Sequence, residues 1–479
     1  MRGRAARIIA GLVTTTTNER VLERRLGPLD AAALIVSNVI GGGILFTPPQ
    51  IAAAVPAALP FLSTWAAGGL LAFAGAMAYA ELAALRPRAG GEYVYLREAF
   101  GRLAAFLSGW TSFIAGFSGA IASSAVILAS YLGRFFPAAG NSTPFLSIPI
   151  FPGIASESSA DRIFSVTLSM SPQTVVALAA IYGMAWVHLR GVGPGRLVGN
   201  ILATLKVSAL LLFIAFGFSL GQGSAANLTQ AGDVAIKGWL LALIPVMFTY
   251  SGWNAASYVA EEVRDPGRNV PRALAIGTGA VVILYLLLNA LYIYVVPVDQ
   301  LAAVKGSMLD LIADRLLGQT AGNIMAIVSI VSLLASISAM TFAGPRVYFA
   351  MGRDGVFFKQ ASSVHTRYKT PAVSILAQAT WSSLLVLTAG ADALVTYTGF
   401  AIVLFSGVAV VALFVLRMRE PNTERPFRAW GYPVAPGIYV IASALILLNG
   451  LMNDPKTTGF GAIVILLGIP LFLLFRRRK

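Results

Sequence analysis

The sequence predicts an all-α integral membrane protein with about 12 transmembrane helices. Hydrophobic residues make up 57% of the 479 residues and charged residues only 11%, a balance that a soluble domain of this length could not bury. Apolar runs of membrane-crossing length recur along the whole chain. Arginine and lysine concentrate in alternate connections between these runs, which is the positive-inside pattern of membrane proteins.

The apolar runs each approach or exceed the roughly 20 residues that a helix needs to cross a hydrocarbon core of about 30 Å. Two longer connections separate them. The Ser/Pro-rich segment 137–172 is expected to lie over the outer surface. Segment 298–319 has apolar residues at helical spacing and is expected to lie along the membrane interface. The runs themselves cover approximately residues 30–56, 60–85, 99–136, 173–190, 197–221, 236–262, 272–297, 320–352, 371–390, 392–417, 433–451 and 458–475.

The net charge of +15 reflects the membrane topology, because the basic residues lie in the connections on one side of the membrane and do not cluster on a soluble face. Both termini are therefore expected in the cytoplasm, and the protein in the plasma (inner) membrane. Residues 1–29 are expected to form a cytoplasmic N-terminal tail, since they lack the hydrophobic region of a cleavable signal. No nucleic acid partner is predicted.

The sequence lacks the residues that several kinds of functional site need. The chain has no cysteine, which excludes disulfides, thiolate metal sites and a disulfide-linked heavy subunit. Its two histidines fall near span ends and predict no metal site. The glycine spacing of GVGPGRLVGN does not fit a nucleotide-binding loop. No cofactor is predicted, and no enzyme either, because the apolar runs hold no paired carboxylates and no histidine cluster.

The first apolar run is interrupted by NVIGGGILFTPP at residues 38–49. Glycine costs about 1 kcal/mol in a helix interior and proline about 3 kcal/mol. Backbone groups freed inside a bilayer need a cavity or a ligand as their partner. The triplet therefore predicts an unwound segment, although small residues also allow a close helix–helix contact.

The sixth run contains FTYSGWNAAS at residues 248–257, with polar residues in mid-span. Runs one and six are five apart, so they cross the membrane in opposite directions. Interrupted segments at matching places in two inverted halves are typical of a transporter binding site. Freed amides at a half-helix N-terminus bind an anion, and freed carbonyls bind a cation. Both together suit a zwitterion, and an α-amino acid is the obvious candidate.

The stretch VIGGGILFTP resembles the unwound first helix of the L-type amino acid transporter (LAT)-like branch of the amino acid–polyamine–organocation (APC) superfamily. The resemblance continues through AYAELAALRPRAGGEYVYLREAFG, FTYSGWNAASYVAEEVRDPGRNVPRAL, GPRVYFAMGRDG and EPNTERPFRAW, and covers nearly the whole chain from about residue 27. It implies a LeuT-type fold with unwound helices 1 and 6. The transport core would span residues 30–417, as inverted five-helix repeats at about 30–221 and 236–417. Spans 11–12 and a basic cytoplasmic tail would follow in 418–479.

The resemblance also implies a substrate site built mainly from backbone. The amides of Gly42 and Gly43 would hold the substrate carboxylate, and the carbonyls of Val39, Phe248 and Ser251 would take the ammonium. Phe248 would also close over the substrate. A serine is usual in the family at the position of Gly42, so here the amides alone would bind the carboxylate. The full expected set is Val39, Ile40, Gly41, Gly42, Gly43, Phe248, Ser251 and Asn254, the last as a support of the second break.

Lys206 lies in the middle of the fifth apolar run, GNILATLKVSALLLFI. A lysine there costs about 2.5–3.5 kcal/mol on insertion scales, and such residues usually face a cavity and carry function. Snorkelling to the membrane surface is the alternative. By the resemblance, its ammonium would replace a sodium ion between helices one and eight, with Ser332, Ser336 or Ser338 completing the shell. It would either couple uptake to protons or stiffen helix one for sodium-free exchange.

Charges of both signs gather at the inner ends of several runs. They are either solvated anchor residues or an inner gate of salt bridges that breaks when the protein opens inward. Exposed pairs are worth only about 0–1 kcal/mol each, a size suited to a switching equilibrium. The gate candidates are Glu81, Glu261, Glu262, Arg264, Arg346 and Arg353.

The sequence thus predicts a secondary active amino acid transporter, or permease, that works by alternating access without sodium. Proton symport and amino acid exchange both stay open. Neutral L-amino acids are favoured, because Glu81, Glu261 and Glu262 sit at span ends and no acidic group is expected in mid-membrane. The alternative is a membrane channel or a transporter-like sensor. The expected partners are the amino acid and the lipid bilayer.

Overall fold

The structure is a computed structural model that describes residues 16–17, 22–151, 154–156, 159–163, 166–220, 222–304, 306–388, 391–453 and 455–477. The N-terminal tail predicted for residues 1–29 therefore falls mostly outside the described residues. The described chain is almost entirely helical, which confirms the predicted fold class.

Each predicted apolar run forms a helix or a series of helix segments. In the described residues, 9 helices are long and apolar enough to cross a membrane, and three shorter apolar helices, Ile236–Thr249, Ala372–Thr388 and Gly461–Phe475, accompany them. In chain order the runs are α2–α3–α4 (Pro28–Val39, Gly42–Phe46, Pro48–Ala54), α5 (Ala58–Leu85), α7–α8 (Arg102–Thr111, Phe117–Leu132), α9 (Pro172–Leu189), α10 (Val192–Leu220), α11–α12 (Ile236–Thr249, Ala255–Tyr258), α13 (Pro266–Val295), α16 (Gln319–Arg353), α17 (Ala372–Thr388), α18 (Ala391–Arg419), α19 (Val434–Asn453) and α20–α21 (Pro455–Leu466, Gly468–Arg477).

The connections add short elements. The strands pair antiparallel as β1 with β6, β2 with β5 and β3 with β4. The β2–β5 hairpin occupies the segment expected as a surface loop. The short elements are α6 (Glu92–Phe100), α14 (Val298–Leu301), α15 (Met308–Leu317), η1 (Ser112–Gly116), η2 (Pro137–Gly140), η3 (Ala225–Thr229), η4 (Ala260–Glu262), η5 (Lys359–Ser362), β1 (Thr16–Thr17), β2 (Leu146–Phe151), β3 (Ile154–Ser156), β4 (Ser159–Ile163), β5 (Val166–Met170) and β6 (Val364–His365).

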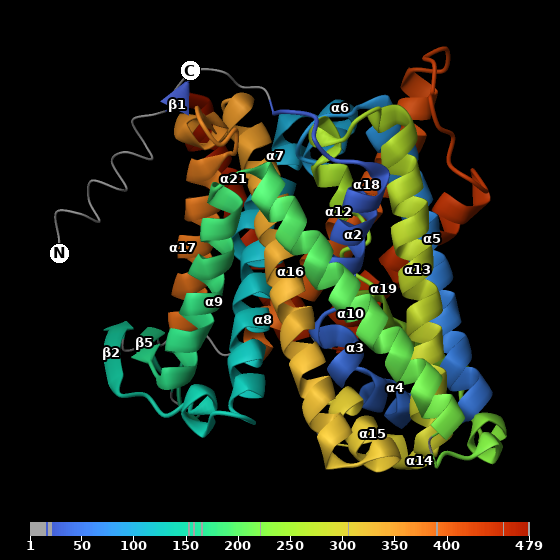
Figure 1. Cartoon of the computed structure of the whole chain (residues 1–479). Coiled ribbons are helices and arrows are strands. Elements are labelled where there is room, and N and C mark those ends of the chain that lie inside the picture. Colours follow the sequence, from blue (N-terminus) through green and yellow to red (C-terminus); the bar gives the residue numbers. More distant parts are fainter. Residues whose placement is uncertain are drawn as a thin grey trace.

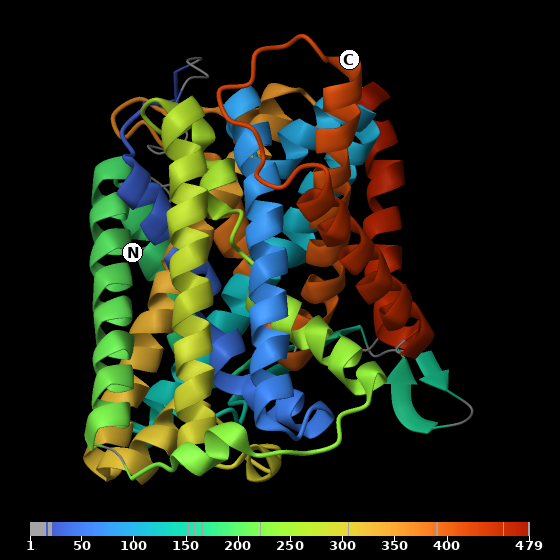
Figure 2. The same ribbon diagram turned by 90° about the vertical axis from the view of Figure 1, so that its right-hand side faces the viewer.

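The long helices run along one common direction (Figure 1). Helix α6 and the start of α2 lie at one end of the bundle, which we call the α6 end, and α14, α15 and the β2–β5 hairpin lie at the other. Figure 2 shows α10, α13 and α5 next to one another across the bundle, and α13 contacts α5, α2 and α10. Helix α16 packs against α8, α10 and α2, so the first and eighth runs meet in the centre.

The amphipathic helix predicted within 298–319 is α15. Its apolar residues Met308, Leu309 and Ile312 are buried, and the helix packs against α16 and α10. The apolar face is therefore directed into the bundle, where the sequence alone had suggested the membrane interface.

The first run is broken at its glycines, because α2 ends at Val39 and α3 begins only at Gly42. A Cβ at Gly43 would lie 3.0 Å from the Cα of Thr249 at the end of α11, so only glycine lets these segments approach so closely. A Cβ at Gly42 would meet only Ile127, at 3.5 Å. The triplet therefore serves both as a break and, at Gly43, as a close contact.

The second break separates α11 from α12. Gly252 has φ of +98°, a left-handed conformation that favours glycine, and a Cβ there would lie 2.7 Å from Asn38 Nδ2. Asn38 Nδ2 donates to the Gly252 carbonyl at 3.3 Å. The two breaks thus meet in the centre of the bundle, as matching breaks in inverted repeats require; the repeat boundaries themselves stay a prediction.

Candidate functional site

The two breaks line a cavity of about 160 Å³. All of the expected substrate-binding residues except Ile40 contribute to its wall. The rest of the wall includes apolar side chains of α8, α16 and α18, such as Phe117, Met340 and Phe405, together with one carboxylate, Glu92. The cavity is thus mostly apolar with a few polar groups, as small-molecule sites usually are.

The backbone around the breaks offers groups of both signs. The first amides of α3, including Gly42 and Gly43, have no acceptor inside the helix and carry its positive dipole end. The Val39 carbonyl accepts from the Tyr285 hydroxyl at 2.9 Å, and the Phe248 carbonyl accepts from the Ser251 amide at 3.0 Å and also faces the Tyr250 amide. A carbonyl has two lone pairs, so that of Val39 can still accept from an ammonium.

Lys206 is fully buried between α10, α2 and α16. Its Nζ donates to the carbonyls of Ser37 at 3.2 Å and Ile40 at 2.5 Å. The Ser336 hydroxyl donates to the same two carbonyls, at 2.9 and 3.3 Å. This arrangement rules out snorkelling of Lys206 to the membrane surface. It also explains the place of Ile40, whose carbonyl bonds Lys206 on the side away from the cavity.

The other serines expected near Lys206 are not part of this shell. The Ser338 hydroxyl lies 2.9 Å from His188 Nε2. Ser332 has no hydrogen bond with Lys206 among the described residues. Of the three serines expected near Lys206, Ser336 therefore supplies the hydroxyl of this shell.

Glu92 is the group that the sequence reasoning missed. It is only 6% exposed, and its Oε1 accepts from the Tyr79 hydroxyl at 2.7 Å and from Asn254 Nδ2 at 2.6 Å. Asn254 also donates to the Tyr258 hydroxyl at 3.1 Å. Burial raises the pKa of Glu92, and hydrogen bonds with Tyr79, Tyr258 and Asn254 act in the opposite direction. The sequence reasoning counted no acidic side chain near the substrate, whereas Glu92 lines the cavity.

The turn before α6 explains how Glu92 reaches the cavity. Gly90 and Gly91 have φ of +115° and +51°, and a Cβ at Gly91 would lie 2.6 Å from the Tyr258 ring. The Gly90 amide donates to the Tyr258 carbonyl at 3.0 Å. The glycine pair before Glu92 in AGGEY was the available signal, since it marks a sharp, tightly packed turn.

Four of the gate candidates form two ion pairs at the α6 end. Arg346 and Glu262 make a bidentate ion pair at 2.7 and 3.0 Å, with side chains 1% and 0% exposed. Arg353 bonds Glu261 at 3.1 Å, and Glu261 also accepts from the Ala89 amide at 2.9 Å.

The remaining gate candidates do not join these two pairs. Glu81 is buried near the end of α5 and bonds Arg417 at 2.6 Å and Arg425 at 3.2 Å. Arg264 has no ion pair with a described residue; its amide donates to the Leu26 carbonyl at 2.9 Å. The sequence suggested exposed salt bridges, which contribute little to stability, but the pairs of Glu262 and Glu81 are buried. The reason is that α16 and α5 bring their side chains inside the helix packing.

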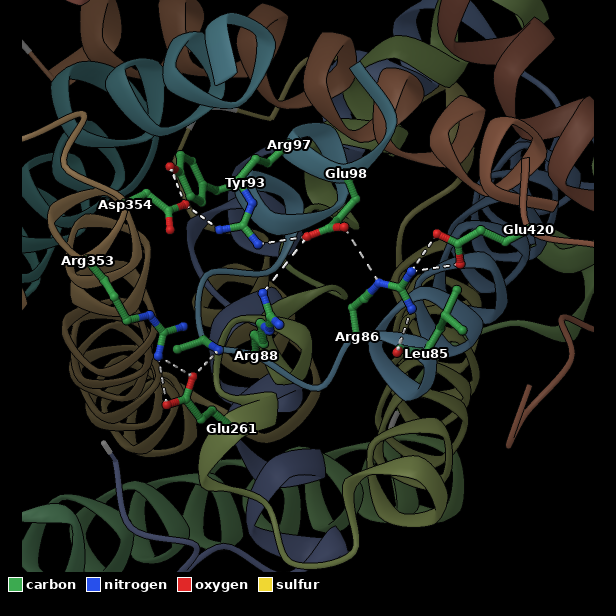
Figure 3. A network of polar contacts seen from close by, with 11 residues as sticks. Leu85, Arg86, Arg88, Tyr93, Arg97, Glu98, Glu261, Arg353, Asp354 and Glu420 are labelled. Carbon is green, nitrogen blue, oxygen red and sulfur yellow. Dashed lines mark hydrogen bonds and ion pairs between the residues drawn. The ribbon is translucent and has the colours of Figure 1, made fainter. Parts of the chain in front are cut away.

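A second layer of charges covers the α6 end (Figure 3). Arg97 of α6 bonds both Asp354, at the end of α16, and Glu98. Tyr93 donates to Asp354 at 2.8 Å. Arg86 bonds Glu420, which follows α18, at 2.6 Å. Together with the Glu262–Arg346 pair, these contacts join the helices at this end of the bundle.

Comparison with known proteins identifies the relatives of this chain. A family model described as amino acid permease matches residues 26–473. The chain is 27% identical over 467 residues to Asc-type amino acid transporter 1 of Mus musculus, covering 95% of this chain and 82% of the relative. It is 28% identical over 462 residues to large neutral amino acids transporter small subunit 2 of Mus musculus, covering 95% and 81%. The b(0,+)-type amino acid transporter 1 of Homo sapiens is 28% identical over 467 residues, covering 96% and 89%.

Proposed function

Since the chain belongs to the amino acid permease family, we propose that it is a secondary active transporter of neutral L-amino acids, independent of sodium, that works by alternating access. It would act either as a proton symporter or as an amino acid exchanger. The observation that carries the proposal is the cavity between the two helix breaks, which presents free amides and carbonyl lone pairs to one small volume.

The substrate class follows from the chemistry of the wall. The amides of Gly42 and Gly43 suit a carboxylate, and the carbonyls of Val39, Phe248 and Ser251 suit an ammonium. The space beyond is lined by apolar groups such as Phe405, which favour a neutral side chain. One of the relatives carries a name that refers to large neutral amino acids, which supports the same class.

Independence of sodium rests on Lys206. Its ammonium occupies the space between the first and eighth runs and bonds the two carbonyls that end α2. The ammonium would repel a second cation there, and the Ser37 and Ile40 carbonyls already accept hydrogen bonds from both Lys206 and Ser336. Lys206 would therefore hold helix α2 in the position that sodium sets in sodium-coupled proteins.

Alternating access requires one end of the bundle to close while the other opens. The Glu262–Arg346 and Glu261–Arg353 pairs are proposed as the inner gate, which would separate when the α6 end opens. We further propose that the protein lies in the plasma membrane with both termini in the cytoplasm, and that it works without a disulfide-linked heavy subunit, since it has no cysteine.

The test is uptake of radiolabelled L-alanine, L-serine and L-leucine into proteoliposomes, with and without sodium, with D-alanine as the control. Each is measured with an inward proton gradient and, separately, with unlabelled amino acid inside. Saturable, stereoselective and sodium-independent uptake is expected. Uptake that does not saturate would favour a channel, and the absence of any uptake would favour a sensor.

A further inference from the structure

We propose that Glu92 is the proton-carrying residue of this transporter. Its carboxylate would take a proton from the aqueous side to which the cavity opens, and the carboxyl would release it on the opposite side together with the amino acid. This inference rests on the proposed transport function and decides between its two modes in favour of proton symport.

The first argument is position. Glu92 lines the same cavity as Gly42, Gly43 and Phe248, while its backbone begins α6 at the α6 end. Arg97 and Glu98 of the same helix are engaged in the outer charge layer (Figure 3). The carboxyl group therefore lies between the substrate site and the gate that would open to the cytoplasm.

The second argument is the lack of a counter-charge. Four acidic side chains of the described residues are buried, and three of them, Glu81, Glu262 and Asp310, lie within 4.0 Å of an arginine. Glu92 alone of these four has no ion pair with a described residue. A buried carboxylate without a cation tends to bind a proton. Its protonation leaves no arginine unpaired, so it can change state at low cost.

The third argument is that the neighbours fit both protonation states. The groups facing Glu92 are uncharged: Tyr79 of α5, Asn254 and Tyr258 of the second break, and more remotely Tyr95 of α6 and Tyr439 of α19. A tyrosine hydroxyl can donate to a carboxylate or accept from a protonated carboxyl. The site therefore holds the carboxylate when water fills the cavity, and the neutral carboxyl when the substrate has displaced that water.

The fourth argument is mechanical. Tyr79 belongs to α5, whereas Asn254 and Tyr258 belong to the broken sixth run. Opening of the α6 end at the Glu262–Arg346 pair would move the segment next to Tyr258, because Glu262 lies only one turn further along. The partners of Glu92 would then separate and water would enter, which favours release of the proton.

The experiment compares three variants in proteoliposomes. Glu92→Gln keeps the size of the side chain but cannot carry a proton. Glu424→Gln makes the same change on an exposed residue without an ion pair in the described chain, and serves as the matched control. Tyr258→Phe keeps the carboxyl and removes a hydroxyl that lowers its pKa. Exchange of L-alanine at equal pH and accumulation driven by an inward proton gradient are measured separately for each.

We expect Glu92→Gln to lose accumulation and its pH dependence by a much larger factor than it loses exchange, whereas Glu424→Gln matches the wild type. In Tyr258→Phe the midpoint of the pH profile should shift to higher pH, because the pKa of Glu92 rises. If Glu92→Gln does not fold, the Tyr258→Phe profile decides, and an unchanged midpoint rejects the proposal.

Three other outcomes would overturn it: accumulation that survives Glu92→Gln, loss of exchange and accumulation by the same factor in that variant, or a wild type that exchanges but never accumulates. The last outcome leaves the proposed transport function intact. Absence of any saturable uptake by the wild type would instead overturn the transport function itself.

Discussion

The region around the two helix breaks and the α6 end both bury charged side chains, and they stabilise them by different means. Around the cavity, Lys206 is bonded to backbone carbonyls and Glu92 to hydroxyls and an amide. At the α6 end, Glu262 and Glu81 are bonded to arginines. A charge held by an opposite charge keeps its protonation state, whereas one held by neutral groups can change it. Under the proposed mechanism, the ion pairs of the α6 end close the cytoplasmic side, and Glu92 in the cavity wall carries the proton.

The largest expected effect comes from the buried cation next to the first helix break. Lys206→Ala removes the group that bonds Ser37 and Ile40, so α2 loses its anchor to α10, and we expect transport to be abolished. Uptake and exchange in proteoliposomes measure this. Glu424→Gln, far from the site, serves as the control. Activity that persists with unchanged pH dependence would refute any coupling or anchoring role of Lys206.

The next effect tests the charge pairing at the α6 end. Arg346→Ala leaves Glu262 buried without its partner, a loss that typically costs about 3–5 kcal/mol. Arg353→Ala affects a pair whose arginine side chain is 25% exposed and should cost much less. The thermal unfolding midpoint of the two purified variants compares them. Equal midpoints would contradict the distinction between buried and rim pairs.

A smaller effect on substrate affinity is expected from changes in the backbone of the cavity wall, which leave its charged side chains unchanged. Gly43→Ala places a methyl group 3.0 Å from the Thr249 backbone, so the two breaks must move apart and the substrate affinity should fall. Gly42→Ala meets only Ile127, at 3.5 Å, and should fold normally. Substrate KM for exchange measures the difference. A greater loss in Gly42→Ala would show that space around the amides, not the approach of the breaks, limits binding.

The smallest effect is expected at the rim of the α6 end. Glu420→Gln removes the partner of Arg86, but both side chains are partly exposed, at 22% for Arg86 and 30% for Glu420. Such pairs contribute about 0–1 kcal/mol, so the unfolding midpoint should move little. A shift as large as that of Arg346→Ala would mean that the outer charge layer, and not the buried pair, holds this end closed.

Much of the fold could be predicted, because hydropathy and helix propensity act locally. The apolar runs, the breaks at Gly41–Gly43 and Ser251–Gly252, and the buried charge of Lys206 all follow from residues close together in the chain. The partners of those residues could not be predicted in the same way. Glu81 was placed in the gate, yet it pairs with Arg417, 336 residues away, because α5 presents it to α18.

The sequence by itself determined the number and order of the spans, where two of them break, and that one cation lies in mid-membrane. These properties depend on the free energy of placing each segment in the bilayer, which its own residues set. Only the tertiary structure decided that Glu92 faces the cavity and that Ser336 joins Lys206. Both depend on which faces of distant helices meet, and on the sharp turn at Gly90 and Gly91 that directs a loop residue inward.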